Sequence, residues 1–143
     1  MAEGKKMKDR LFSNISLEDM LSINAAEMED GCSFLPFTDI VEREDSFLIE
    51  MELPGISKEN IEIEICENVV VVRGVKLRAD QDLKGTIRYH CMGIVYGKFK
   101  RKFDIPKPFN SREVKAKLDN GLLVIILPKI VDKRKKIIKI PVE

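Results

Sequence analysis

Several residue types are scarce in this chain of 143 residues, and each scarcity excludes a class of protein. It has no Trp, one His and three Cys, namely Cys32, Cys66 and Cys91. The cysteines lie far apart without C-x-x-C spacing, which favours reduced thiols in a cytoplasmic protein over a disulfide scaffold or a metal site. No apolar run approaches the ~18 residues that a membrane-spanning helix needs. We therefore expect no bound metal, no disulfide framework and no membrane span.

Motifs for catalysis and cofactor binding are equally scarce. Neither G-x-x-x-x-G-K-[ST] nor G-x-G-x-x-G occurs, so the sequence predicts no nucleotide site and no cofactor. A Ser-His-Asp or Cys-His device would have to use His90, and Cys91 follows it directly. Neighbours on a strand point to opposite faces, so we favour a loop or interface role for both residues. An enzyme that uses His90 and Cys91 is the rival hypothesis.

Charge of one sign is not in excess. The 25 Lys and Arg residues nearly balance 24 Asp and Glu residues, and the formal net charge of +1 gives no overall field toward nucleic acid or membrane. The basic N-terminus is followed by no apolar h-region, so it is not typical of a secretion signal. Residues 133–136 are basic and could contact nucleic acid or direct import. Without interleaved aromatic residues, a solubilising spacer is favoured.

The stretch that organises the chain is residues 114–128. Its first half alternates apolar and charged residues, which is typical of a strand with one buried and one solvent-facing side. Asn120 and Gly121 predict a tight hairpin turn with positive φ. The returning strand, residues 122–127, is apolar at both parities, so we expect both of its faces to be covered. Pro128 lacks an N–H and should end the pairing.

Most of the chain between Phe37 and Leu127 also alternates with period two. Turns of Pro, Gly, Asn and Asp separate the segments, and residues 57–60 are expected to form a single helical turn. The expected strands are residues 38–42, 47–53, 61–65, 69–72 and 99–105, besides the hairpin. Strands of this length with short connections indicate an all-β, immunoglobulin-like antiparallel β-sandwich.

One connection is much longer than the others. Residues 76–98 are polar at first, and their only strand-like piece is Thr86, Ile87, Arg88, Tyr89 and His90. A connection of this length inside a compact sandwich is functional or disordered. A lone strand within it can pair with its own sheet or with the edge of another chain's sheet, and the residues alone leave both open.

The two termini differ in character from the sandwich. In the N-terminal arm Ser16 is typical of an N-cap, and apolar residues follow at helical spacing, so we expect a short, marginal helix. This helix either packs on its own domain, which the stretch alone slightly favours, or forms an adhesive arm. The apolar residues of this region include Phe12, Ile15, Leu17, Met20 and Leu21.

The C-terminal tail is charged over residues 132–136 and should be extended there. Ile138 and Ile140 follow, two residues apart, so they point the same way in an extended chain. Two isoleucines on one side of a tethered segment form a two-pronged plug for an apolar groove.

Together these segments resemble a known family. Ala116, Gly121 and Leu123 fit the A-x-x-x-x-G-x-L motif of the α-crystallin domain of small heat-shock proteins, in the long-loop type of bacteria and plants. Four further segments resemble the family. Glu52-Leu53-Pro54-Gly55 is similar to its D/E-L-P-G segment, and Ile138-Lys139-Ile140 is similar to its C-terminal I-x-I motif. Its Y-H and G-x-F stretches are matched by Tyr89-His90 and by Gly97-Lys98-Phe99. The likeness covers roughly residues 37–142. Two positions depart from it, because Gly93-Ile94 stands where members often carry Glu-Arg, and Asp104 where they often carry Arg.

The resemblance implies an ATP-independent chaperone, a holdase that binds unfolding proteins, prevents their aggregation and forms dimers that assemble into larger oligomers. It implies that Thr86–His90 pairs with a partner subunit's sheet and that the N-terminal arm contributes to client binding. It also implies that Ile138 and Ile140 dock in a neighbour's groove lined by Ile61, Ile63, Ile65, Val114, Ala116 and Leu118.

We therefore expect an N-terminal arm over residues 1–35, an α-crystallin domain over 36–129 and a C-terminal extension over 130–143. The expected partners are other copies of the chain and unfolded client proteins, without nucleic acid, membrane, cofactor or catalysis. The alternative is a monomeric adaptor sandwich of the CS-domain co-chaperone type, which leaves the long loop and the paired tail isoleucines unexplained.

Overall fold

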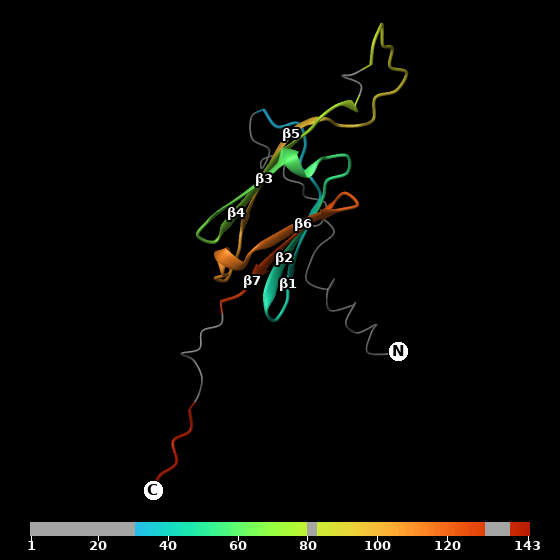
Figure 1. Ribbon diagram of the computed structural model, residues 1–143. Coiled ribbons are helices and arrows are strands. Elements are labelled where there is room, and N and C mark those ends of the chain that lie inside the picture. The colour runs from blue at the N-terminus through green and yellow to red at the C-terminus, as the bar shows by residue number, and fades with distance from the viewer. Residues whose placement is uncertain (1–30, 80–82, 131–137) are drawn as a thin grey trace, which may run out of the picture.

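The computed structural model describes residues 31–79, 83–130 and 138–143. In this part of the chain two antiparallel sheets pack face to face, with the orders β1-β2-β7-β6 and β3-β4-β5 (Figure 1). The strands are β1 (Thr38–Glu42), β2 (Ser46–Glu52), β3 (Ile61–Cys66), β4 (Val69–Lys76), β5 (Gly97–Asp104), β6 (Lys115–Asp119) and β7 (Leu122–Pro128). Single 3-10 turns, η2 (Lys58–Asn60) and η4 (Ser111–Glu113), precede β3 and β6. The predicted all-β sandwich is confirmed.

The core lies between the two sheets and is built from alternate residues of the central strands. Ile49 of β2 pairs with Ile125 of β7, so both face inward at the same level. Full burial of such a side chain contributes roughly 1.5–3 kcal/mol. The buried residues of the four core strands are Phe47, Ile49, Met51, Val70, Val72, Phe99, Phe103, Leu123, Ile125 and Leu127.

The β6–β7 hairpin has the turn that its sequence predicts. Asn120 and Gly121 have φ values of 48° and 76°, as a two-residue hairpin of this hand requires. A Cβ on Gly121 would lie 3.1 Å from the Cα of Pro54, and the Leu53 N–H donates to the Gly121 carbonyl at 2.6 Å. The turn therefore supports the bend that follows β2.

Strand β4 is longer than the sequence indicates. The sequence predicts a strand over residues 69–72, but β4 continues through Gly74 to Lys76, which pairs with Gly97 of β5. A Cβ at position 74 would lie 2.5 Å from the Asn60 carbonyl oxygen and 2.7 Å from the Phe99 ring. This glycine is thus a point of close packing inside the sheet and does not end the strand.

Two burial predictions for the hairpin are wrong. On β6 the expected buried side is open, since Ala116 is exposed and Leu118 is half-buried. On β7 the second face is not fully covered, because Leu122 and Ile126 are 38% and 40% exposed. Strand β6 is the last in its sheet, so its apolar side faces the open flank of the sandwich.

Two segments project from the sandwich in opposite directions (Figure 1). Residues 83–96 of the long loop extend beyond the ends of β4 and β5, and in the described part of this loop no residue belongs to a strand. Residues 138–143 of the tail lie beyond the end of β7. The helix expected in the N-terminal arm lies outside the described residues.

Candidate functional site

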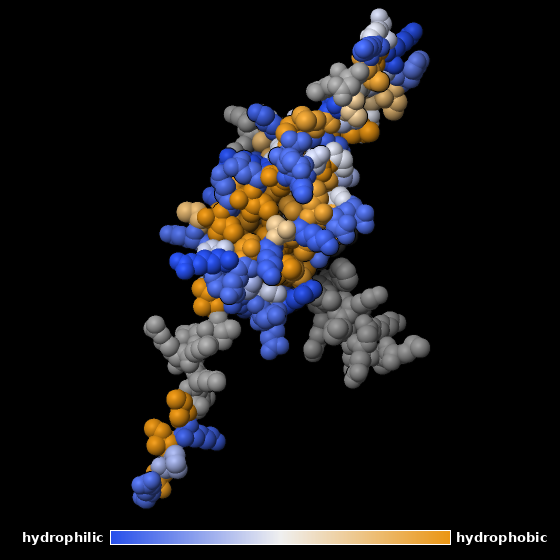
Figure 2. Space-filling model, viewed as in Figure 1, coloured by the Kyte–Doolittle hydropathy of each residue, from blue (hydrophilic) through white to orange (hydrophobic). Residues whose placement is uncertain are grey.

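An open groove runs between the edge strands β3 and β6. Ile61 and Ile63 form one wall, and Ala116 and Leu118 form the other. Leu123 of β7 also lines it and is itself buried. The groove has a volume of about 360 Å³, and Lys58 and Lys117 lie on its rim. Figure 2 shows an apolar area in the middle of this face, surrounded by hydrophilic side chains.

The groove contains four of the six residues predicted for it. Ile65 and Val114 pack against the core but are not among the residues that line this groove. Lys58 and Lys117 line the groove as well but were not predicted to do so. The alternation of β6 places Lys117 on the solvent side of the strand. It could therefore not be predicted as a groove residue, although it lies at the rim.

The apolar side of β3 faces the groove because its charged side chains are held on the other face. Arg73 of β4 lies opposite Glu62 in the ladder, with Nε 3.9 Å from Oε2. The same guanidinium is also paired with Glu64. These exposed pairs add little stability, but they fit the register that turns Ile61 and Ile63 inward.

The residues of the A-x-x-x-x-G-x-L motif have separate structural roles at this groove. Ala116 is a small wall residue that leaves the groove open, and Leu123, which pairs with Leu118, lines the groove from the neighbouring strand. Gly121 makes the turn between their strands. The motif thus specifies both the shape of the groove and the hairpin that forms one side of it.

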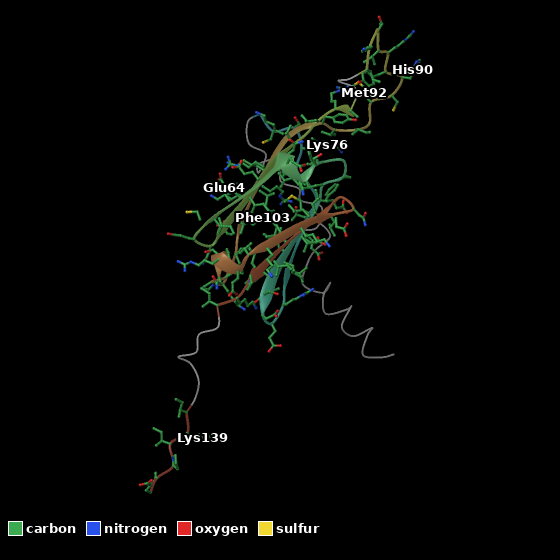
Figure 3. The ribbon with its side chains drawn as sticks, viewed as in Figure 1. Glu64, Lys76, His90, Met92, Phe103 and Lys139 are labelled. Atoms are coloured by element: carbon green, nitrogen blue, oxygen red, sulfur yellow. The ribbon has the colours of Figure 1, made fainter. Side chains whose placement is uncertain are left out.

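The long loop presents apolar side chains to solvent. Seven of them are between 43% and 63% exposed, and Figure 3 shows His90 and Met92 in its outer part. The predicted segment, Thr86, Ile87, Arg88, Tyr89 and His90, is exposed along its whole length. The seven apolar or aromatic residues are Leu77, Leu83, Ile87, Tyr89, Met92, Ile94 and Val95.

Strand β1 is an open edge with apolar residues. Among the described residues it pairs with β2 only, and it is the outermost strand of its sheet. Phe37, Ile40 and Val41 are exposed on or beside it. An edge strand of this kind is a template on which a strand from another chain can pair.

The tail isoleucines do not occupy the groove of their own chain. Ile138 and Ile140 are 80% and 82% exposed, and Figure 3 shows Lys139, which lies between them, far from the sandwich. Docking of these residues in a neighbour's groove stays a prediction.

The N-terminal arm is described only at its root. Phe12, Ile15, Leu17, Met20 and Leu21, predicted to bind clients, lie outside the described residues. At the root, the Ser33 N–H donates to the Lys98 carbonyl at 2.8 Å and the Phe34 ring centroid is 5.5 Å from that of Phe99. Arg101 also donates to the Pro36 carbonyl at 3.0 Å, so residues 33–36 are fixed along β5.

The described residues contain no group of three or more His, Cys, Asp or Glu residues that could hold a metal ion. His90 and Cys91 are both exposed on the loop, and Cys32, Cys66 and Cys91 are free thiols. No helix in the described ranges is long and apolar enough to cross a membrane.

Comparison with known proteins finds relatives over most of the chain. The profile of the "Hsp20/alpha crystallin family" matches residues 39–143. Small heat shock protein C4 of Rickettsia felis is 34% identical over 132 residues, which are 92% of this chain and 79% of that protein. The 16.9 kDa class I heat shock protein 1 of Triticum aestivum is 35% identical over 89 residues, 62% of this chain and 58% of that protein.

Solved structures give the same result. The hspA structure from Xanthomonas axonopodis has a TM-score of 0.60 at 28% identity and covers 68% of this chain and 96% of that one. Heat shock protein 16.0 from Schizosaccharomyces pombe shares the fold, with a TM-score of 0.65 at 24% identity over 77% of this chain and 99% of that one. With its groove, hairpin motif and sandwich in place, this chain belongs to the Hsp20/alpha-crystallin family of small heat-shock proteins.

Proposed function

We propose that this small heat-shock protein is an ATP-independent holdase whose subunits assemble through their exposed apolar segments. The observation that carries the proposal is that one chain has two apolar binding surfaces and two exposed apolar segments that fit them, but the segments do not contact those surfaces within the chain. An apolar groove matches a tail with two exposed isoleucines, and an open edge strand matches an exposed loop segment.

The tail and groove have matching chemistry. Burial of one isoleucine contributes roughly 1.5–3 kcal/mol, so Ile138 and Ile140 together make a contact of only a few kcal/mol. Ordering of the tail offsets part of that gain. A single contact of this size opens readily, while many of them in one oligomer hold the assembly together.

The loop and the β1 edge fit by strand addition. Thr86, Ile87, Arg88, Tyr89 and His90 would extend the partner's β1-β2-β7-β6 sheet beside β1, where backbone hydrogen bonds supply affinity. Exposed side chains on both sides, such as Ile87 of the loop and Ile40 of β1, would then leave water. This contact defines a dimer in which each loop reaches the other subunit.

Client binding follows from opening of the weaker contacts. A released groove and a released arm would present apolar surface to unfolding proteins, and no step needs a nucleotide. The three free thiols fit the reducing cytoplasm, where we place the protein. We assign no catalytic role to His90 or Cys91.

The tail contact is tested by the double substitution Ile138→Ser and Ile140→Ser. We expect the mass by light scattering to fall from that of a large oligomer to that of a dimer, because the apolar plug is lost. Lys139→Ser is the matched control, since it changes the residue between the two isoleucines. A native mass in the double variant would contradict the plug.

Chaperone activity is tested by aggregation of a heat-unfolded client protein without ATP. We expect suppression at stoichiometric amounts of the chain and no change when ATP is added. A purified protein that is monomeric and suppresses nothing would refute the holdase and favour the CS-type adaptor instead.

A further inference from the structure

Arg78 lies between two tyrosine rings in the long loop. Its Cζ is 5.0 Å from the ring centroid of Tyr89 and 5.3 Å from that of Tyr96. One guanidinium nitrogen also donates to the Tyr89 hydroxyl. Lys76 Nζ lies 5.9 Å from the Tyr96 ring, on β4 at the base of the loop. We name Arg78, Tyr89 and Tyr96 the tyrosine clamp.

The clamp joins three separate parts of the loop. Arg78 follows β4, Tyr96 directly precedes β5, and Tyr89 belongs to the segment that we expect to pair with a partner. Arg78 is half-buried although most residues around it are exposed. The contacts of Arg78 therefore connect the start and the end of the loop to the segment that is expected to pair.

Arginine is suited to this position for a physical reason. Its planar guanidinium can stack on aromatic rings and donate hydrogen bonds from its edge, whereas the compact ammonium of lysine has no flat face with which to stack. The loop lacks strand pairing in its described part, so its shape depends on side-chain contacts such as these. Without them, ordering of the loop would add to the cost of binding.

We propose that the tyrosine clamp holds the loop in the shape that pairs with a second copy of the chain, which makes Arg78 a positioning residue for dimer formation. This inference rests on the loop exchange of the proposed function. An apparent dissociation constant equals the intrinsic one divided by the fraction of the binding partner that is in the competent shape. In a symmetric dimer both loops are affected, so a loss of order in the loop counts twice.

The composition supplies a direct probe of the clamp. Tyr89 and Tyr96 are the two tyrosines of the chain, which has no tryptophan. The tyrosine bands of the near-ultraviolet circular dichroism spectrum therefore come only from the two rings of the clamp. They can be recorded independently of the thermal transition of the sandwich.

The experiment compares the full wild-type chain with Arg78→Lys and Tyr96→Leu. The monomer fraction is measured by native mass spectrometry over a dilution series, beside the tyrosine bands and the melting temperature. We expect both variants to raise the dimer Kd roughly tenfold or more. Arg78→Lys should also weaken the tyrosine bands, without a change in the melting temperature. Arg112→Lys, on the distant η4 turn, is the matched control and should behave as wild type.

The failures of the two proposals are distinguishable. A wild-type chain that is monomeric at every concentration would refute the loop exchange and with it this inference. A wild-type dimer whose Kd and tyrosine bands are both unchanged in Arg78→Lys would overturn the clamp alone. Weakened tyrosine bands with an unchanged Kd would show that the clamp orders the loop but does not position it for pairing, which also overturns the proposal.

Discussion

Glu42 joins the end of β1 to two lysines from distant parts of the chain. Its Oε1 lies 2.5 Å from Lys107 Nζ and 2.8 Å from Lys129 Nζ. Lys129 also donates to the Arg43 carbonyl at 2.6 Å and lies 4.9 Å from the Phe47 ring centroid. Lys129 directly follows β7, so this cluster fixes the point at which the tail leaves the sandwich.

These contacts make stability depend on the charge of Glu42. The hydrogen bond from Lys107, then that from Lys129, holds the pKa of Glu42 below its ordinary value. A lowered folded-state pKa gives stability that is present above the pKa of the unfolded chain and is lost as pH falls through the folded value. Melting temperatures measured against pH should thus show Glu42→Gln less stable than wild type near neutrality, with the difference vanishing in acid. Glu44→Gln, an exposed carboxylate of the same turn, should show no such convergence.

Gly121 is a second residue whose identity is set by geometry. Its φ of 76° is costly for any residue with a Cβ, and that Cβ would press on Pro54. We expect Gly121→Ala to lower the free energy of unfolding by about 1–2 kcal/mol, measured by urea denaturation. Gly93→Ala is the control, because a Cβ there meets nothing within 4 Å. Equal effects of the two substitutions would show that the turn carries no strain.

At the scale of elements, the alternation of apolar residues predicted the strands well. Ile61, Ile63 and Ile65 alternate with Glu62 and Glu64, and this pattern gave the bounds of β3 to within one residue. The alternation does not show whether another element covers the apolar side of a strand. Ala116 and Ile125 are both apolar and pair directly, yet one is exposed and the other fully buried, because only β7 has a neighbour on both sides.

The loop shows a second limit of sequence reasoning. Thr86–His90 has a strand-like pattern, but a strand needs a partner, and pairing with a second chain leaves no signal in one chain's periodicity. The clamp was also missed, because Arg78, Tyr89 and Tyr96 lie far apart in the sequence without a repeating spacing. The roles of the groove, loop and tail residues, and the division at residues 35 and 129, stay predictions.

The groove itself can be tested on one element. Ala116→Arg would place a long cationic side chain in the groove beside Lys117, so we expect loss of tail docking and a smaller oligomer by light scattering. The melting temperature should change little, because Ala116 is exposed. Lys115→Arg, one residue earlier and on the opposite face of β6, is the control. A full-sized Ala116→Arg oligomer would place the tail elsewhere.

At the scale of the whole molecule, the exposed apolar residues fall mainly on projecting or edge segments. They lie on the loop, on the tail, along β1 and on the outer side of β7, while the sheets enclose a buried apolar core. Because the loop and the tail project from the sandwich, contacts made by them can form and break while the sandwich stays folded. The arm is different, because its root is packed on β5 and therefore contributes to stability, whatever its proposed part in client binding.

Two truncations separate these contributions of the arm. Removal of residues 1–31 keeps Ser33, Phe34 and Pro36 against β5, so the melting temperature should be that of wild type while suppression of client aggregation weakens. Removal of residues 1–36 also takes away the ring that packs on Phe99 and the carbonyl that accepts from Arg101. We expect this longer truncation to cost roughly a further 1–3 kcal/mol of unfolding free energy. If the shorter truncation left suppression intact, the arm would have no part in client binding. If the two truncated chains had the same free energy of unfolding, the contacts of residues 33–36 would not support the sandwich.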